Sequence, residues 1–279
     1  MTMEIRASVA EDEKELAPVM YRAFTEFNLS VGIPPSADFE SVETAELFMH
    51  NIFQSSNNYG VTALDKASGR PIGAAFLNFI GESVQRIGPV FVDPAYGNKG
   101  VGKAMMSALI DRANATNAKS IYLAQIAANT KSFSLYVKLG FRPVECITYF
   151  GGSMDKSLYT WESGKEGFNV RPMEESDVRA CSELHNSVLG HERETEIHEM
   201  LHINPANAWV ALKNGILEAY TTGFSLEGHS TAISEEAFVA LFQVVCHQKC
   251  NFPINIHIPG RINPSLIEWA LKGGLQMIR

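Results

Sequence analysis

Apolar and polar residues follow two periods along the first half of the chain, and they predict an alternation of helices and strands. Leu16, Met20 and Phe24 stand at helical spacing within residues 11–27, which predicts an amphipathic helix. Shorter apolar runs separated by turn residues predict strands. The expected order is strand 4–7, helices 11–27 and 39–55, strands 59–65, 71–79 and 84–92, helix 101–116, strand 121–126, helix 130–139 and strand 141–148.

The second half repeats this order, which predicts two similar units in tandem. Residues 168–172 (FNVRP) resemble residues 3–7 (MEIRA), and both runs lead into an acidic helix start. Asn214-Gly215 predicts a hairpin turn between two further strands. The expected domains are residues 1–150, a linker at 151–167 and a second domain at 168–279, whose closing strands are not evident before the chain ends.

Composition narrows the class of protein. The chain has 279 residues, 46% of them hydrophobic, and a net charge of −8. This charge argues against nucleic acid as a partner and suits a cationic acceptor. No signal peptide or membrane span is expected, and four scattered cysteines do not predict a disulfide framework. We therefore expect a cytoplasmic protein.

A glycine-rich turn joins the strand at 84–92 to the helix that follows. Residues 97–102 read GNKGVG, and such turns point several backbone N–H groups at one spot before a helix N-terminus. The turn predicts a cradle for a phosphate or pyrophosphate. It fits most of a P-loop, although Ala104 replaces the magnesium-binding hydroxyl. It fits the start of a dinucleotide fingerprint, although Met105 replaces the third glycine. A tight turn without a ligand also stays open.

A second motif lies at residues 129–141, which read NTKSFSLYVKLGF. Asn129 and Tyr136 share one helix face about two turns apart, and Gly140 is suited to end the helix. Loop and helix together resemble the GNAT N-acetyltransferase superfamily, with its loop R/Q-x-x-G-x-G/A and its helix N-x-x-[AS]-x-x-L-Y-x-K-x-G-F. The resemblance covers about residues 3–150. The whole chain resembles a tandem GNAT protein with a degenerate second repeat.

The resemblance implies an α/β (α+β) fold of two tandem GNAT-like acyl-CoA N-acyltransferase units, each a mixed central sheet flanked by helices. It implies acetyl-CoA as co-substrate, no metal, and direct attack by an amine of a small molecule or peptide. Tyr136 is implied as the general acid. Cofactor binding is implied for Phe91, Val92, Gly97, Asn98, Lys99, Gly100, Val101, Gly102, Lys103 and Asn129. Neither nucleic acid nor membrane is an expected partner, and a homodimer stays open.

Two features depart from the family pattern. Gly97 replaces the usual Arg or Gln, so one phosphate-facing side chain is missing. The strand at 84–92 carries no carboxylate, and Glu82 just before it is the nearest candidate for a general base. We expect the acceptor pocket at the loop of residues 28–38 and the second helix. A non-catalytic acyl-CoA sensor or scaffold is the alternative function.

The second unit lacks the residues that carry the chemistry. Aligning the two terminal helices places Ala270 where Tyr136 stands in the first unit. At the position of the glycine loop, residues 230–236 (STAISEE) offer no glycine and two carboxylates, which would repel a pyrophosphate. We therefore expect this unit to be structural or to shape the acceptor pocket.

One further motif points to another chemistry. His198, Glu199 and His202 match the H-E-x-x-H pattern of zinc hydrolases. No third ligand is evident, since Ala208 stands where the extended motif has a histidine, although Glu218 and Glu227 are candidates. A helix that buries Ile197, Met200 and Leu201 is the favoured interpretation, and a zinc hydrolase is the remote alternative.

Overall fold

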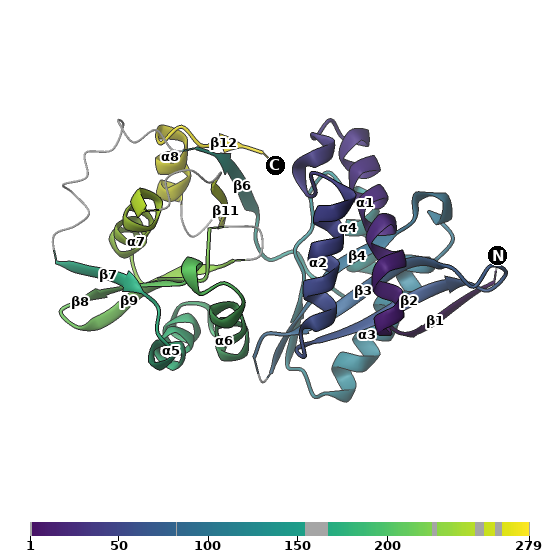
Figure 1. Cartoon of the computed structure of the whole chain (residues 1–279), viewed down its shortest axis with the longest axis horizontal. Coiled ribbons are helices and arrows are strands. Elements are labelled where there is room, and N and C mark those ends of the chain that lie inside the picture. Colours follow the sequence, from purple (N-terminus) through teal and green to yellow (C-terminus); the bar gives the residue numbers. More distant parts are fainter. Residues whose placement is uncertain are drawn as a thin grey trace. The chain divides into compact units, whose positions relative to one another are not determined.

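The computed structural model divides the chain into two compact units, Met1–Arg142 and Pro143–Arg279 (Figure 1). It describes residues 2–81, 83–153, 167–224, 228–248, 254–259 and 264–278. No helix among these residues combines the length and the apolar character that a membrane crossing requires.

The first unit is a mixed five-stranded sheet with helices on both faces. The strands follow the order β1-β2-β3-β4-β5, antiparallel throughout except for the parallel pair β4–β5. The elements are β1 Met3–Ala7, α1 Glu13–Ser30, α2 Val42–Gln54, β2 Asn58–Asp65, β3 Pro71–Phe79, β4 Val84–Val92, α3 Val101–Ala115, β5 Ser120–Tyr122 and α4 Thr130–Lys138, with short 3-10 turns at Ala10–Asp12, Pro35–Ala37 and Pro94–Tyr96.

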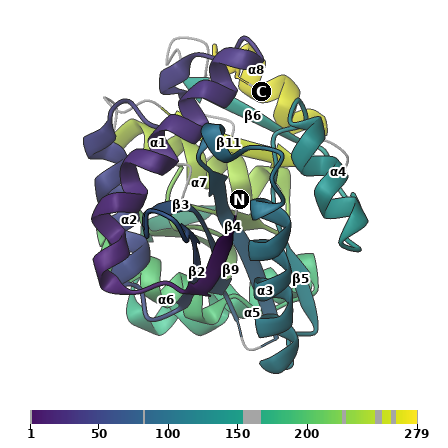
Figure 2. The same cartoon turned by 90° about the vertical axis from the view of Figure 1, so that its right-hand side faces the viewer.

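Two separate cores hold this sheet between its helices. Phe76 of β3 packs with Leu16 in the core under α1 and α2. Its neighbour Leu77 points to the opposite face and packs with Met105 in the core under α3 and α4. Figure 2 shows α1 and α2 on one side of the β1–β4 strands and α3 on the other. Each fully buried Leu or Met side chain contributes about 1.5–3 kcal/mol.

The pairing between β4 and β5 is short, and this opens the sheet. The two strands pair only from Val84↔Ser120 to Arg86↔Tyr122. A bulge at Gly88-Pro89 also breaks the register between β4 and β3, where two residues stand opposite Phe76. Beyond Arg86, β4 is therefore paired on one side only among the described strands, which leaves a line of backbone groups on its other edge.

The second unit repeats the element order of the first. Its four antiparallel strands follow the order β10-β9-β8-β7, which corresponds to β4-β3-β2-β1. The elements are β7 Phe168–Pro172, α5 Val178–Leu189, α6 Glu194–Ile203, β8 Trp209–Lys213, β9 Ile216–Thr221, β10 Ser230–Ala232, α7 Glu235–Gln248, β11 Ile254–Pro259, α8 Pro264–Lys272 and β12 Gln276–Met277, with 3-10 turns at Glu175–Asp177 and Pro205–Asn207.

A strand from the middle of the chain completes the second unit. β6, Ile147–Gly152, lies between β11 and β12 and pairs antiparallel with both, and its teal colour stands out against them in Figure 1. The strand expected at 141–148 therefore begins later. Residues 141–146 form no strand, and Pro143 has no N–H to donate to a ladder. Two glycines of the expected linker end β6, and residues 154–166 of that linker lie outside the described residues.

Both units begin with the same ion-pair arrangement. The guanidinium of Arg6 donates to both carboxylate oxygens of Asp12, at 2.7 and 2.6 Å, and Arg171 does the same to Asp177, at 2.6 and 2.8 Å. Burial alone would raise the pKa of each carboxyl, but the hydrogen bonds outweigh it and lower the pKa of both. This shared arrangement supports the internal repeat that the sequence predicts.

Candidate functional site

The open edge of β4 presents the backbone of alternate residues. The Asp93 N–H donates to the carbonyl of Ile72 on β3 at 2.8 Å. Because this direction alternates along an antiparallel strand, the backbone groups of Phe91 also face β3. Those of Val90 and Val92 face the edge that β5 leaves open. The register thus favours Val90 over Phe91 as a backbone partner for a ligand, and the Phe91 side chain is buried against α1 and α2.

The glycine loop turns sharply between β4 and α3. Asn98 and Gly100 adopt left-handed conformations, with φ of 60° and 82°, which asparagine and glycine tolerate best. Gly97 has an ordinary φ of −57°, so backbone strain does not require glycine there. The turn ends at Gly100, which directly precedes the first residue of α3.

Two polar contacts hold the loop in place. Asp93 accepts the Ala95 N–H at 3.0 Å through one carboxylate oxygen and the Arg22 guanidinium at 2.6 Å through the other. The hydroxyl of Tyr96 donates to Asp65 on β2 at 3.3 Å. These contacts tie the loop to α1 and to the sheet, and an ordered loop lowers the entropic cost of binding a ligand.

The N-terminus of α3 is left uncapped. The first helical hydrogen bond runs from the Ala104 N–H to the Gly100 carbonyl at 3.0 Å, so the N–H groups of residues 101–103 have no acceptor within the helix. Gly100 has no side chain to cap them. Ser41 caps α2 and Asn129 caps α4. Helices α1 and α6 also lack a side-chain cap, but they carry glutamates in the first turn, and α3 carries no acidic residue there. The free N–H groups and the helix dipole make this end of α3 suited to an anion.

Gly102 lies in this first turn, and the protein around it leaves room for a methyl group. A Cβ built on Gly102 would meet the side chains of Leu135 and Val92 at 3.6 and 3.9 Å, which are ordinary contacts. The surrounding fold therefore does not require glycine here. A glycine at this position leaves the backbone open to close approach by a ligand.

Lys131 contributes a charge that the sequence motif did not indicate. Its ammonium lies 3.5 Å from the point where a Cβ of Gly97 would stand. Gly97 is the position where related loops carry Arg or Gln, so a cation from α4 occupies the neighbourhood of the missing side chain. Lys99 instead folds back on its own loop, donating to the Ala95 carbonyl at 2.9 Å and lying over the Tyr96 ring. Lys103 is exposed.

Helix α4 carries the two remaining predicted residues. Asn129 uses its side-chain oxygen to cap the helix, accepting the Ser132 N–H at 3.0 Å. Tyr136 lies two turns further along, 9% exposed, with its ring edge-on to Phe141. Burial raises the pKa of Tyr136, and a hydrogen bond with Ser132 opposes this only in part. The phenol is therefore protonated at neutral pH.

The structure describes the predicted acceptor loop but not the predicted general base. Glu82 lies outside the described residues. Helix α1 continues to Ser30, so the acceptor loop begins later than expected, and α2 starts at Val42. Asn28 is fully buried at the end of α1 and donates to Asp38 at 2.8 Å, which fixes the two ends of the loop to each other.

The equivalent junction of the second unit is closed to an anion. Only two residues separate β10 from α7, and Ser234 caps the helix by accepting the Ala237 N–H at 3.1 Å. Glu235 and Glu236 stand in its first turn. These carboxylates and the occupied cap explain why no phosphate cradle forms here.

The end of α8 confirms which residue replaces Tyr136. The Leu275 N–H donates to the Ala270 carbonyl at 3.0 Å, as the Phe141 N–H donates to the Tyr136 carbonyl at 3.1 Å. A glycine with positive φ precedes the donor in both helices. Ala270 therefore occupies the position of Tyr136, as the sequence alignment predicts, and the second unit has no phenol there.

The open edge of β4 leads into the uncapped N-terminus of α3, an arrangement suited to an extended ligand that carries an anionic group at one end. Residues 24–141 match the family model described as the acetyltransferase (GNAT) family. The first unit belongs to this family, and the chain has a tandem GNAT fold. This fold supports transfer of an acyl group from acyl-CoA to an amine.

Solved structures share the fold over almost the whole chain. A candidate acetyltransferase from Pyrococcus horikoshii matches with a TM-score of 0.71 and 16% identity, covering 99% of this chain and 85% of that one. A GCN5-related N-acetyltransferase from Sphaerobacter thermophilus matches with a TM-score of 0.64 and 17% identity, covering 99% and 92%. Comparison with curated proteins finds no match.

Proposed function

We propose that this chain is an acetyl-CoA-dependent N-acetyltransferase with one active site, in its first unit. The observation that supports this most strongly is the continuity between two features. The open edge of β4 runs directly into the loop, and the loop ends at the uncapped N-terminus of α3. A long thioester with a pyrophosphate at one end fits such a path better than a compact phosphate ligand does.

In this proposal, the pyrophosphate binds the N–H groups of residues 101–103. Lys131 and Lys103 supply the positive charge that Gly97 does not. The pantetheine arm lies along the open edge of β4 and pairs with the backbone of Val90 and Val92, as an added strand would. Asn129 orients α4 at the end of this path by capping its first turn.

The path also leads to Tyr136. From Asn129 to Tyr136 the axis of α4 advances about 10 Å, at about 1.5 Å per residue. From Val92 back to Pro89, β4 advances about the same distance. Tyr136 shares its core with Val90 and Val92 of β4, so a thiol carried along this strand edge would lie near the Tyr136 side chain.

The chemistry is a direct acyl transfer. The neutral amine attacks the thioester carbonyl, and a backbone N–H of β4 stabilises the oxyanion that forms. The C–S bond then breaks, and the phenol of Tyr136 donates its proton to the departing sulfur as general acid. The proton lost by the amine leaves through water or through Glu82, and Tyr136 is reprotonated from solvent. The raised pKa of Tyr136 keeps the acid in its protonated form beyond neutral pH.

The acceptor in this proposal is the amine of a small molecule or a peptide. It would bind beside the loop between α1 and α2, where the first unit has the longer connection: Val31 to Ser41 separate these helices, against Gly190 to Arg193 in the second unit. Loops over a rigid scaffold often carry specificity.

Calorimetric titration with acetyl-CoA, followed by a thiol-release assay over a panel of amines, tests this function. We expect one binding site per chain and turnover with at least one amine. Two sites would contradict the assignment to the first unit alone. Saturable binding without turnover on any amine would favour the acyl-CoA sensor, and absence of binding would reject both functions.

A further inference from the structure

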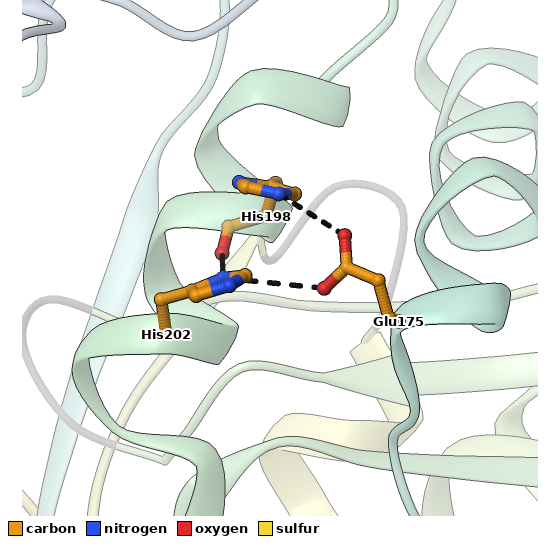
Figure 3. Close-up of side chains that lie close together, drawn as sticks. All are labelled: Glu175, His198 and His202. Carbon is orange, nitrogen blue, oxygen red and sulfur yellow. Dashed lines mark hydrogen bonds and ion pairs between the residues drawn. The ribbon is translucent and has the colours of Figure 1, made fainter.

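Three side chains of types that can bind metals meet on the surface of the second unit. His198 and His202 stand one turn apart on α6, and Glu175 reaches them from the 3-10 turn before α5 (Figure 3). Nε2 of His198 lies 3.0 Å from one oxygen of Glu175, and Nδ1 of His202 lies 4.0 Å from the other. One nitrogen or oxygen of each residue falls within 4.8 Å of the other two.

We propose that Glu175, His198 and His202 bind a divalent transition-metal ion, with zinc as the best fit. Two imidazoles and one carboxylate form a donor set that zinc accepts with tetrahedral geometry. Ligand atoms at about 2.0–2.1 Å from such an ion stand roughly 3.3 Å apart. The His198–Glu175 pair is already close to that separation. Because its Nδ1 faces a backbone carbonyl, His202 would bind the ion through Nε2, and bringing that nitrogen to the ion needs rotation of side chains that are 55–61% exposed.

The hydrogen bonding of His202 prepares it for this role. Its Nδ1 lies 2.9 Å from the carbonyl of His198, and a carbonyl can only accept, so the proton is on Nδ1. Nε2 then holds the lone pair that a metal requires. Such a bond to the second ring nitrogen fixes the tautomer of metal-binding histidines.

The structure supplies the ligand that the H-E-x-x-H motif did not indicate. From the sequence no third ligand was evident, and Glu218 and Glu227 downstream were only candidates. Glu218 lies within β9, Glu227 is outside the described residues, and the carboxylate comes from Glu175 upstream. All three ligands are exposed, so bulk water reaches the ion. An exposed centre of this kind suits binding rather than hydrolysis, since hydrolytic zinc sites gain from a shaped, dry cavity.

The ion would join two helices that already share a core. Val178 and Leu184 of α5 pack with Ile197 and Leu201 of α6. A metal held by α6 and by the turn that begins α5 would cross-link these helices and stabilise the folded second unit. Stabilisation of this kind grows with the ratio of free metal to its dissociation constant.

Titration of the metal-free full-length chain with ZnCl₂ tests the proposal. We expect one zinc per chain and a rise of the melting temperature with zinc. Glu175→Gln, His198→Ala and His202→Ala should each weaken binding about tenfold or more. Co²⁺ should give visible absorption bands that the same variants remove. All three residues are exposed, so circular dichroism should show folded variants.

The chain offers a matched control. His50 lies 3.0 Å from Glu13 in a pair on the first unit. This pair resembles the His198–Glu175 pair, but it is not part of a group of three possible metal ligands among the described residues. His50→Ala should leave zinc binding unchanged. Absence of saturable zinc binding would overturn the proposal, as would wild-type affinity in Glu175→Gln and His202→Ala. Half a zinc per chain with zinc-dependent dimers would also overturn it, because the ligands would then come from two copies. None of these outcomes depends on acetyl transfer.

Discussion

The two units share a scaffold but differ where a strand meets a helix. Each has the same order of elements, the same bidentate Arg–Asp pair at its start, and a helix ended by a glycine with positive φ. Between β4 and α3 the first unit inserts eight residues, Asp93 to Gly100. Between β10 and α7 the second unit has Ile233 and Ser234 alone.

This difference separates what folds the protein from what binds a ligand. Buried apolar faces and the Arg–Asp pair stabilise both units, and they do not depend on the loop. Ligand binding depends on backbone N–H groups that the fold leaves without partners. In the second unit, Ser234 accepts a backbone N–H of the first turn of α7, and two glutamates in that turn would repel an anion. The same fold therefore persists there without a phosphate cradle.

The largest expected effect concerns Tyr136, whose counterpart is Ala270. Tyr136→Phe removes the proposed acid and should lower kcat by about 10²–10⁴, with acetyl-CoA affinity changed less than about twofold. Calorimetry and steady-state kinetics measure the two quantities separately. Tyr149→Phe is the control, because it removes a buried hydroxyl of the second unit that donates to Asn255 at 2.9 Å. Equal losses of kcat in both variants would remove the phenol from the mechanism.

The second effect concerns acid stability, and it should distinguish the units. Burial, followed by the charges of Arg193 and His191, lowers the pKa of His185 to about 3. An unfolded histidine titrates near about 6.5, so the folded second unit binds fewer protons. The contribution of His185 to the stability of the second unit should be fully present above about pH 6.5 and should be lost progressively as the pH falls from there towards 3.

Tryptophan fluorescence can follow this decline in the second unit. The three tryptophans of the sequence, Trp161, Trp209 and Trp269, all belong to the second unit, and the first unit contains none. The midpoint of guanidinium unfolding should be lower at pH 5 than at pH 7. His185→Gln should flatten this dependence, whereas His50→Ala should preserve it. A fluorescence midpoint that does not change between the two pH values would contradict the buried neutral histidine.

A smaller effect should follow from filling the space at Gly102. Gly102→Ala adds a methyl group that the protein accommodates but a bound pyrophosphate does not. Acetyl-CoA affinity should fall about tenfold, equivalent to about 1.4 kcal/mol, while the melting temperature stays level or rises, since alanine favours the helix by about 1 kcal/mol. Asn114→Ala, in the last turn of the same helix, should leave affinity unchanged. A Gly102→Ala variant with wild-type affinity would place the pyrophosphate elsewhere.

The smallest effect concerns Lys131. An exposed charge contributes about 0.2–1 kcal/mol, so Lys131→Met should weaken acetyl-CoA binding about two- to fivefold, and more at low salt. Lys138→Met removes an exposed charge from the far end of α4 and serves as control. If both variants weaken binding equally, a general field effect explains the loss and Lys131 has no special place at the cradle.

Much of the first unit could be predicted from short stretches of sequence. Helical spacing places α1, the glycine loop places the start of α3, and Asn129 to Phe141 define α4 and its end. These features depend on neighbours within a few residues, where periodicity, capping and turn chemistry act. The repeat could also be predicted from a short stretch, because residues 168–172 resemble residues 3–7 in sequence.

Long-range pairing decided the rest. Local sequence does not show that β6 pairs with β11 and β12, or that β5 pairs with β4 over only three residues. Nor does it show that Lys131 lies near Gly97, or that Glu175 lies near the histidines of α6. Each of these contacts joins residues far apart in the chain, and it depends on how apolar faces pack rather than on any local motif. The sequence alone determined the order of elements and the residues able to carry chemistry, and the tertiary structure decided which of them meet.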